Sequence, residues 1–189
     1  MSDHSSARTT IGLIILSAVA ATASFTMHFE GTVYKAYLDD TGHPTICNGH
    51  TKSVRLGDVA SKETCIKYYN EDKTQAITQA IKVSPEIVDN KDVLNATGDF
   101  VLNAGIGAYV GSPMYTNFRN RQWGKGCDSF ENYWVYGTYP RPKSGYFCKP
   151  KPGTNKYYCR LNGLVERRYY ERRLCYGIND FPDFASTSN

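Results

Sequence analysis

Six cysteines limit the ways in which this chain of 189 residues can fold, and all of them follow an apolar N-terminal stretch. An even number of cysteines after an export-like segment favours disulfides made in an oxidising compartment. Several connectivities are open, and we expect the pairs Cys47–Cys65, Cys127–Cys175 and Cys148–Cys159. The last pair would close a short hairpin rich in proline and glycine, CKPKPGTNKYYC.

A metal site is the alternative for the first of these pairs. Cys47, His50 and Cys65 could together supply three zinc ligands. However, the chain lacks the paired C-x-x-C spacing that is typical of structural zinc sites. We therefore expect disulfides, and neither a metal nor any other cofactor.

The segment IGLIILSAVAATASF, residues 11–25, is uncharged and rich in small residues. It is shorter than the roughly 20 residues of a usual membrane span. It could be a signal peptide cut after Ala21-Thr22-Ala23, an uncleaved weak anchor, or a buried core helix. The first two interpretations place the remaining chain outside the cytoplasm, in the periplasm or at the inner membrane. We expect residues 1–28 to be such an export signal or signal-anchor.

The first half of the remaining chain mixes helix and hairpin signals. Helical character extends to Tyr37, and the glycine-, proline- and threonine-rich stretch that follows predicts a β-hairpin. Ser61 is expected to cap a helix that runs to about Val83. Apolar positions at helical spacing predict a central buried helix, at Val93, Thr97, Phe100 and Ala104. Together these signals predict an α+β fold.

The second half predicts short helical turns at 115–121 and 126–136 and a final helix at 161–176. Between them, residues 137–160 are rich in proline, glycine and lysine and are expected to form a surface loop. We expect a frayed tail at 178–189. The overall prediction is a small sheet lobe early, a mostly helical lobe late, and a cleft between them.

The positive charge of the chain is concentrated in its last third. Between Tyr115 and Cys175 there are 13 Lys and Arg against 4 Asp and Glu, a net charge of +9. Such a surface suits an anionic cell-wall polymer or membrane face, and a merely solvated face is the alternative.

Glu30, Asp39 and Thr45 lie close behind the apolar segment. Glycosidic cleavage needs two carboxyl groups in different environments, one protonated to donate to the leaving oxygen and one ionised. Apolar residues before Glu30 favour its protonated form, whereas Asp39 lies in a polar turn and is expected to stay charged. The Thr45 hydroxyl could hold a water for attack. A solvated helix end followed by a turn is the alternative interpretation.

This stretch resembles phage lysozymes of glycoside hydrolase family 24. The resemblance rests on Glu-Gly at 30–31, eight residues between Glu30 and Asp39, five between Asp39 and Thr45, and Gly-His-Thr at 49–51. Three later stretches are similar to family motifs in the same order, FVLNAGIGAY, GKGCDSFENYWVYG and GLVERRYYERRLC. The chain most resembles signal-anchor-release endolysins, which carry a weak anchor directly before the catalytic helix.

The resemblance implies a two-lobed lysozyme-like fold over residues 29–177, with an insertion at 137–160, after an N-terminal apolar helix. It implies that Glu30 is the general acid, Asp39 its partner carboxylate, and Thr45 an aid to the attacking water. The implied reaction is an inverting hydrolysis of the MurNAc–GlcNAc bond of peptidoglycan. The expected partners are peptidoglycan and the inner membrane, with no nucleic acid, and the chain is expected to be a monomer.

Two other functions remain open at this point. A lytic transglycosylase-like or chitinolytic enzyme would not need Asp39 and Thr45 as partners, so the retained trio argues against it. A secreted, disulfide-stapled wall-binding module or inactive lysozyme-like scaffold is the second alternative. The short distance in sequence from the anchor to Glu30 also suggests a hypothesis: the cleft stays unassembled until the anchor leaves the membrane.

Further candidates carry weaker signals. His50 and Asn103 are candidate substrate-binding residues, and a structural role is the alternative for a histidine in Gly-His-Thr. Arg167, Arg168 and Glu171 are expected to form an internal charge network rather than to contact substrate. Among the aromatic residues that could stack on sugars, we expect Trp134 in the core, and Tyr139, Tyr157 and Tyr158 exposed.

Overall fold

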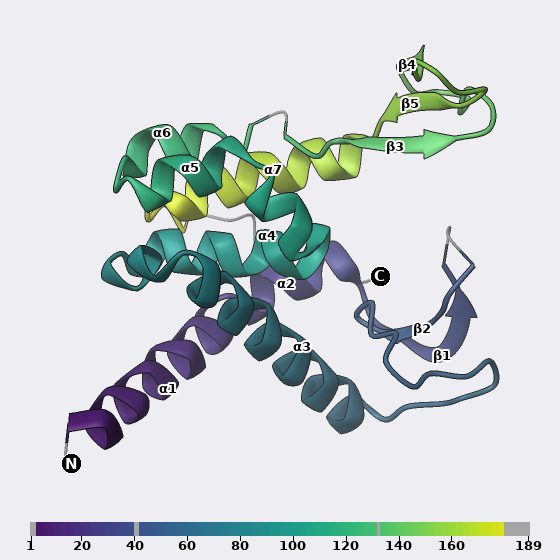
Figure 1. Cartoon of the computed structure of the whole chain (residues 1–189). Coiled ribbons are helices and arrows are strands. Elements are labelled where there is room, and N and C mark those ends of the chain that lie inside the picture. The colour runs from purple at the N-terminus through teal and green to yellow at the C-terminus, as the bar shows by residue number, and fades with distance from the viewer. Residues whose placement is uncertain (1–2, 40–41, 132, 180–189) are drawn as a thin grey trace.

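A computed structural model describes residues 3–39, 42–131 and 133–179, with two small antiparallel sheets beside a body of helices (Figure 1). The predicted α+β class, with a small sheet lobe and a mostly helical lobe, is therefore confirmed. Residues 180–189 of the expected tail at 178–189 lie outside the described residues, as does Asp40, beside Asp39.

The N-terminal segment forms two helices, α1 (Asp3–Ala21) and α2 (Ala23–Glu30). Helix α1 packs against α3 and α4, and it buries Ala18 and Val19 in the main core. Among the described helices none is by itself long and apolar enough to cross a membrane, but Thr9–Ala21 and α2 meet those limits as a pair bent by 50°. The apolar segment is thus seen here in a packed state.

Helix α2 ends earlier than the sequence predicts, because Gly31 leaves the helical region with φ 63°. The expectation of helical character up to Tyr37 is wrong. Residues Val33–Leu38 form strand β1 instead, which pairs antiparallel with β2 (Pro44–Cys47) as the predicted hairpin. β-Branched and aromatic residues in β1 favour a strand once glycine has ended the helix.

The long helices match their sequence signals. Helix α3 (Lys62–Val83) is capped by Ser61, whose hydroxyl accepts from the Thr64 amide. A short 3₁₀ helix, η1 (Pro85–Asp89), leads to the central helix α4 (Lys91–Val110). Helix α4 contributes Phe100, which is fully buried, and contacts both α3 and α7.

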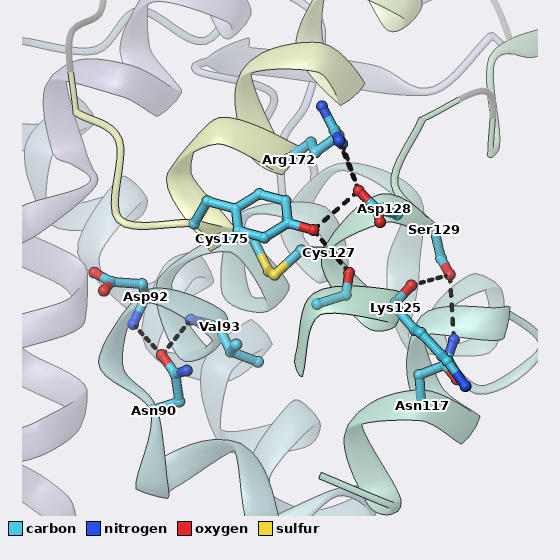
Figure 2. Close-up of a disulfide and its surroundings, with 12 residues drawn as sticks. Asn90, Asp92, Val93, Asn117, Lys125, Cys127, Asp128, Ser129, Arg172 and Cys175 are labelled. Atoms are coloured by element: carbon cyan, nitrogen blue, oxygen red, sulfur yellow. Dashed lines mark hydrogen bonds and ion pairs between the residues drawn. A yellow bond between two sulfur atoms is a disulfide. The ribbon is translucent and has the colours of Figure 1, made fainter. Parts of the chain in front are cut away.

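Three shorter or later helices close the core, α5 (Pro113–Arg119), α6 (Trp123–Asp128) and α7 (Asn162–Cys175). The Cys127–Cys175 disulfide joins α6 to the end of α7 (Figure 2). Beside it, Arg172 donates to Asp128 at 2.6 Å and the Tyr176 hydroxyl donates to the Gly124 carbonyl at 3.0 Å. These contacts fix α7 at its C-terminal end.

Residues 137–160 are more regular than the surface loop that the sequence predicts, and the hairpin expected at Cys148–Cys159 is present. They form most of a three-stranded antiparallel sheet, with β5 (Tyr157–Arg160) between β3 (Tyr136–Tyr139) and β4 (Cys148–Pro150). The Cys148–Cys159 disulfide joins directly opposed residues of β4 and β5. Proline and glycine occupy the connections of this sheet, so their abundance signals turns rather than the absence of strands.

The aromatic expectations around this sheet are also wrong. Trp134 is 52% exposed and has φ 55°, while its neighbours Phe130 and Val135 are fully buried and fill the core. Tyr139, Tyr157 and Tyr158 are half-buried rather than exposed, and the rings of Tyr139 and Tyr158 are each covered by a lysine of the same segment, Lys143 and Lys151. The structure has the disulfides Cys47–Cys65, Cys127–Cys175 and Cys148–Cys159, the same pairs as expected.

Candidate active site

Glu30 lies at the end of α2, half-buried, where the chain leaves the helical body for the β1–β2 hairpin. Its side chain faces a pocket of about 310 Å³. The pocket is lined by residues from α2, α4, the β3–β4 connection and the start of α7: Phe29, Glu30, Asn103, Tyr139, Lys143, Tyr146, Leu161, Asn162, Gly163, Leu164 and Arg167. Of the residues predicted from sequence, this pocket brings together Glu30, Asn103 and Arg167.

Arg167 is the direct partner of Glu30. Its Nη1 donates to Glu30 Oε1, and its guanidinium is almost fully buried. Arg167 also stacks over the Phe29 ring, with its Cζ 5.7 Å from the ring centroid. The sequence predicts apolar surroundings for Glu30, but it does not predict that a cation contacts its carboxyl group.

The other side of Arg167 is held by Asp99, a fully buried carboxylate on α4. Arg167 Nη2 donates to Asp99 Oδ2 at 2.9 Å, and Lys73 Nζ on α3 lies 3.0 Å from Asp99 Oδ1. The Thr26 hydroxyl on α2 donates to the same Oδ1 at 2.6 Å. Burial opposes the charge on Asp99, but Arg167 and Lys73 outweigh it and lower the pKa of this carboxyl.

Arg168 and Glu171 extend the buried network toward Asn103. Arg168 Nη2 donates to Asn103 Oδ1 at 2.6 Å and lies 3.0 Å from Glu171 Oε1. Burial raises the pKa of Glu171 to about 8, and the pKa of the Arg168 guanidinium is lowered by its own burial. As expected, Arg167, Arg168 and Glu171 form an internal charge network, although Arg167 also reaches the pocket.

Asp39 and Thr45 lie on the β1–β2 hairpin, and neither is among the residues that line the Glu30 pocket. Asp39 Oδ1 accepts from the His43 amide at 2.9 Å, which fixes the turn between the strands. Thr45 is buried, and its hydroxyl donates to the His43 carbonyl at 3.0 Å. The Thr45 oxygen therefore keeps acceptor capacity for a water.

Residues at the end of the hairpin approach Glu30. The Asn48 side chain donates to the Gly31 carbonyl and to the Thr32 hydroxyl, so it ties β2 to the end of α2. Gly49 has φ 86°, and a Cβ on it would lie 3.5 Å from Glu30 Oε2. The glycine of Gly-His-Thr thus lets the backbone turn beside the Glu30 carboxyl.

Both ring nitrogens of His50 have partners within the protein. Its Nδ1 lies 2.7 Å from Asp72 Oδ2 and its Nε2 lies 3.1 Å from the Lys52 carbonyl. The ring also stacks on Tyr68, with the centroids 4.0 Å apart. With both ring nitrogens engaged, this geometry favours the structural role for His50.

Sequence reasoning missed Lys73 and Asp99. Lys73 lies on the buried face of α3, four residues after Tyr69 and three before Ala76, both of which are buried. Asp99 lies next to Phe100 in the central buried helix. A charged residue at an apolar position of each helix was therefore the available signal for a buried ion pair.

The helical body, the small hairpin lobe and the glutamate at their junction define a lysozyme-like protein. A model of the phage lysozyme family matches residues 27–171, which is more than half of the chain. The chain therefore belongs to the phage lysozyme family, whose members are glycoside hydrolases that act on peptidoglycan.

Relatives and solved structures agree with this assignment. A SAR-endolysin of Bacteriophage PS119 is 29% identical over 149 residues, which cover 77% of this chain and 75% of the relative. The active form of the P1 phage endolysin Lyz has a TM-score of 0.64 at 15% identity and covers 89% of this chain and 96% of that one. The muramidase domain of SpmX from Asticaccaulis excentricus has a TM-score of 0.65 at 21% identity, covering 82% and 94%. The two structures support the fold.

Proposed function

We propose that this protein is an endolysin that hydrolyses the MurNAc–GlcNAc bond of peptidoglycan, with Glu30 as the general acid. The observation that carries the proposal is the placement of Glu30, at the end of α2, in a pocket between the helical body and the insertion at 137–160, within a phage lysozyme chain. A pocket of about 310 Å³ is within the usual range for ligand sites, which begins near 300 Å³.

Asp39 and Thr45 are the proposed partners on the hairpin. Asp39 would stay ionised opposite the developing positive charge and accept the proton that the attacking water loses, while the Thr45 oxygen would accept a hydrogen bond from that water. An inverting reaction requires carboxyl groups about 6.5–9.5 Å apart, which leaves room for that water.

Arg167 has a defined part in this proposal. A general acid must carry a proton when the leaving oxygen departs. Arg167 holds the Glu30 carboxylate in place before substrate binds. In the productive complex Glu30 turns from Arg167, takes up a proton from water and donates it to the glycosidic oxygen. Asp99 retains Arg167 during this change, so the buried guanidinium keeps a partner.

Residues 1–28 are the proposed signal-anchor, and residues 29–177 the catalytic domain with its insertion. The support is the name SAR-endolysin, carried by relatives from Bacteriophage PS119 and Pseudomonas phage phiKMV, together with the bent apolar pair that precedes Glu30. While the anchor is in the membrane of the host, α2 cannot bring Glu30 to Arg167 or Thr26 to Asp99. Release into the periplasm would complete both contacts.

Digestion of purified sacculi tests the reaction and separates it from its alternatives. The oxidised protein should release reducing MurNAc ends, and mass spectrometry should show no anhydro sugar. Anhydro products would instead indicate a transglycosylase. Binding to sacculi without any release of reducing ends would indicate a wall-binding module and would refute the proposal.

A further inference from the structure

The β3–β5 sheet forms part of the wall of the Glu30 pocket. Tyr139, Lys143 and Tyr146, all from the insertion at 137–160, line the pocket together with Glu30 and Arg167. A ligand that fills this pocket therefore lies against the insertion and against Glu30 at the same time. The long insertion is thus part of the site and is not a remote surface loop.

Lys143 is held in place at the edge of the pocket by two aromatic rings. Its Nζ lies 5.1 Å from the centroid of the Tyr139 ring and 4.9 Å from that of Tyr146. Its amide donates to Cys148 Sγ at 3.3 Å, so the Cys148–Cys159 disulfide fixes the backbone that carries it. Two cation–π contacts reduce the freedom of a long side chain before any ligand binds.

The Lys143 ammonium has hydrogen-bond donors to spare. Among the described residues no carboxylate lies within ion-pair distance of it, in contrast to Lys73 with Asp99 and Lys67 with Glu71. The segment 137–160 has six basic residues and no acidic one. Two rings can engage two of the three N–H groups of an ammonium at most, so Lys143 can still donate to an anion.

We propose that Lys143 is a substrate-binding residue that recognises a carboxylate on the peptide stem of the glycan while the sugar backbone lies at Glu30. This inference rests on the proposed function. It follows from the shared pocket, because an anion bound there with the glycan belongs most simply to the glycan strand itself. A membrane phosphate would have to share the pocket with the sugars.

The test compares two forms of one substrate. Native sacculi carry free stem carboxylates, and treatment with carbodiimide and ammonia converts them to amides without changing the glycan. Lys143→Met keeps the apolar side chain on the rings and removes the charge. On native sacculi it should lower kcat/KM about tenfold, mainly through KM. On amidated sacculi the kcat/KM of the wild type should fall by the same factor. The wild type and Lys143→Met should then have equal kcat/KM.

Matched variants separate this effect from folding and from general charge. Lys149→Met removes a similar lysine, whose Nζ lies 5.0 Å from the Tyr136 ring but which does not line the pocket. Lys149→Met should have the same kcat/KM as the wild type on both substrates. Lys143→Arg should retain most activity on native sacculi.

Three results would overturn the inference. The kcat/KM of Lys143→Met on native sacculi could equal that of the wild type, or it could be no lower than that of Lys149→Met. Alternatively, Lys143→Met could remain less active than the wild type on amidated sacculi. Equal losses in both methionine variants would indicate general attraction to an anionic surface. Failure of the proposed function is distinguishable, because the wild type would then release reducing ends from neither substrate.

Discussion

Arg167 forms an ion pair with Glu30 although the two lie 137 positions apart in the sequence. The same guanidinium donates to the buried carboxylate of Asp99 at 2.9 Å. One side chain on α7 thus links the end of α2 to the middle of α4. Because the fork of an arginine fixes both partners in one plane, the position of the proposed acid depends on the buried network behind it.

The first prediction concerns this fork. Arg167→Lys keeps the charge, but an ammonium cannot hold Glu30 and Asp99 in the same bidentate manner. We expect kcat to fall by about 10- to 100-fold, with a smaller change in KM, since small displacements of catalytic groups have effects of this size. The matched control is Arg173→Lys on the same helix, which does not line the pocket. Equal kcat values for the two variants would contradict a positioning role for Arg167.

The second prediction concerns the stability supplied by the network. Lys73 and Asp99 are both fully buried, so Lys73→Met leaves a buried carboxylate with one cation fewer. We expect the free energy of unfolding to fall by about 3 kcal/mol in denaturant titrations. Lys67→Met removes an exposed pair with Glu71 on the same helix and should cost less than about 1 kcal/mol. A loss below about 1 kcal/mol for Lys73→Met would show that this pair does not stabilise the fold.

The third prediction concerns the pH dependence of stability. Burial raises the pKa of Glu171 to about 8 in the folded protein, from 4.5 for a free side chain. Between these values the unfolded chain releases a proton that the folded protein keeps, so the Glu171 contribution to stability falls as pH rises. Glu171→Gln should flatten the decline of Tm from about pH 5 to pH 8. An unchanged slope in calorimetry would exclude this carboxyl as its source.

The fourth prediction concerns the anchor. Ser17, Ala20, Ala21 and Ser24 are exposed on α1 and α2, so replacing them with leucine adds affinity for lipid without displacing buried residues such as Ala18. During expression in the host, the leucine variant should stay in the membrane fraction and lysis should be delayed or lost. The control is a variant in which each Ser at these positions is replaced by Ala and each Ala by Ser. Lysis on the normal schedule by the leucine variant would contradict the release model.

The sequence was sufficient for features that depend on local chemistry. The cap at Ser61, the hairpin and the buried face of α4 follow from residue types at fixed spacing. The disulfide pairs also agree with the expected connectivity. The phage lysozyme motifs pointed to the end of α2 before the structure placed Glu30 in its pocket.

The remaining features depend on contacts between distant segments. In β1 only Ala36 is buried, so the strand has no alternating pattern to distinguish it from a continued helix. The Lys73–Asp99 pair joins two helices, and the charge of each residue alone argues against burial. The role of Tyr139 and Lys143 as pocket wall depends on how β3–β5 is placed against α7, which turn residues do not specify.

The central claim is that Glu30 supplies the proton that allows the glycosidic bond to break. The most direct test is the rate at which purified Glu30→Gln releases reducing ends from native sacculi, after its fold has been checked by its Tm. Glutamine keeps the shape of the side chain but has no acidic proton, so we predict that the rate falls by at least about 10²-fold. A Glu30→Gln protein that digests sacculi at the wild-type rate would contradict the account.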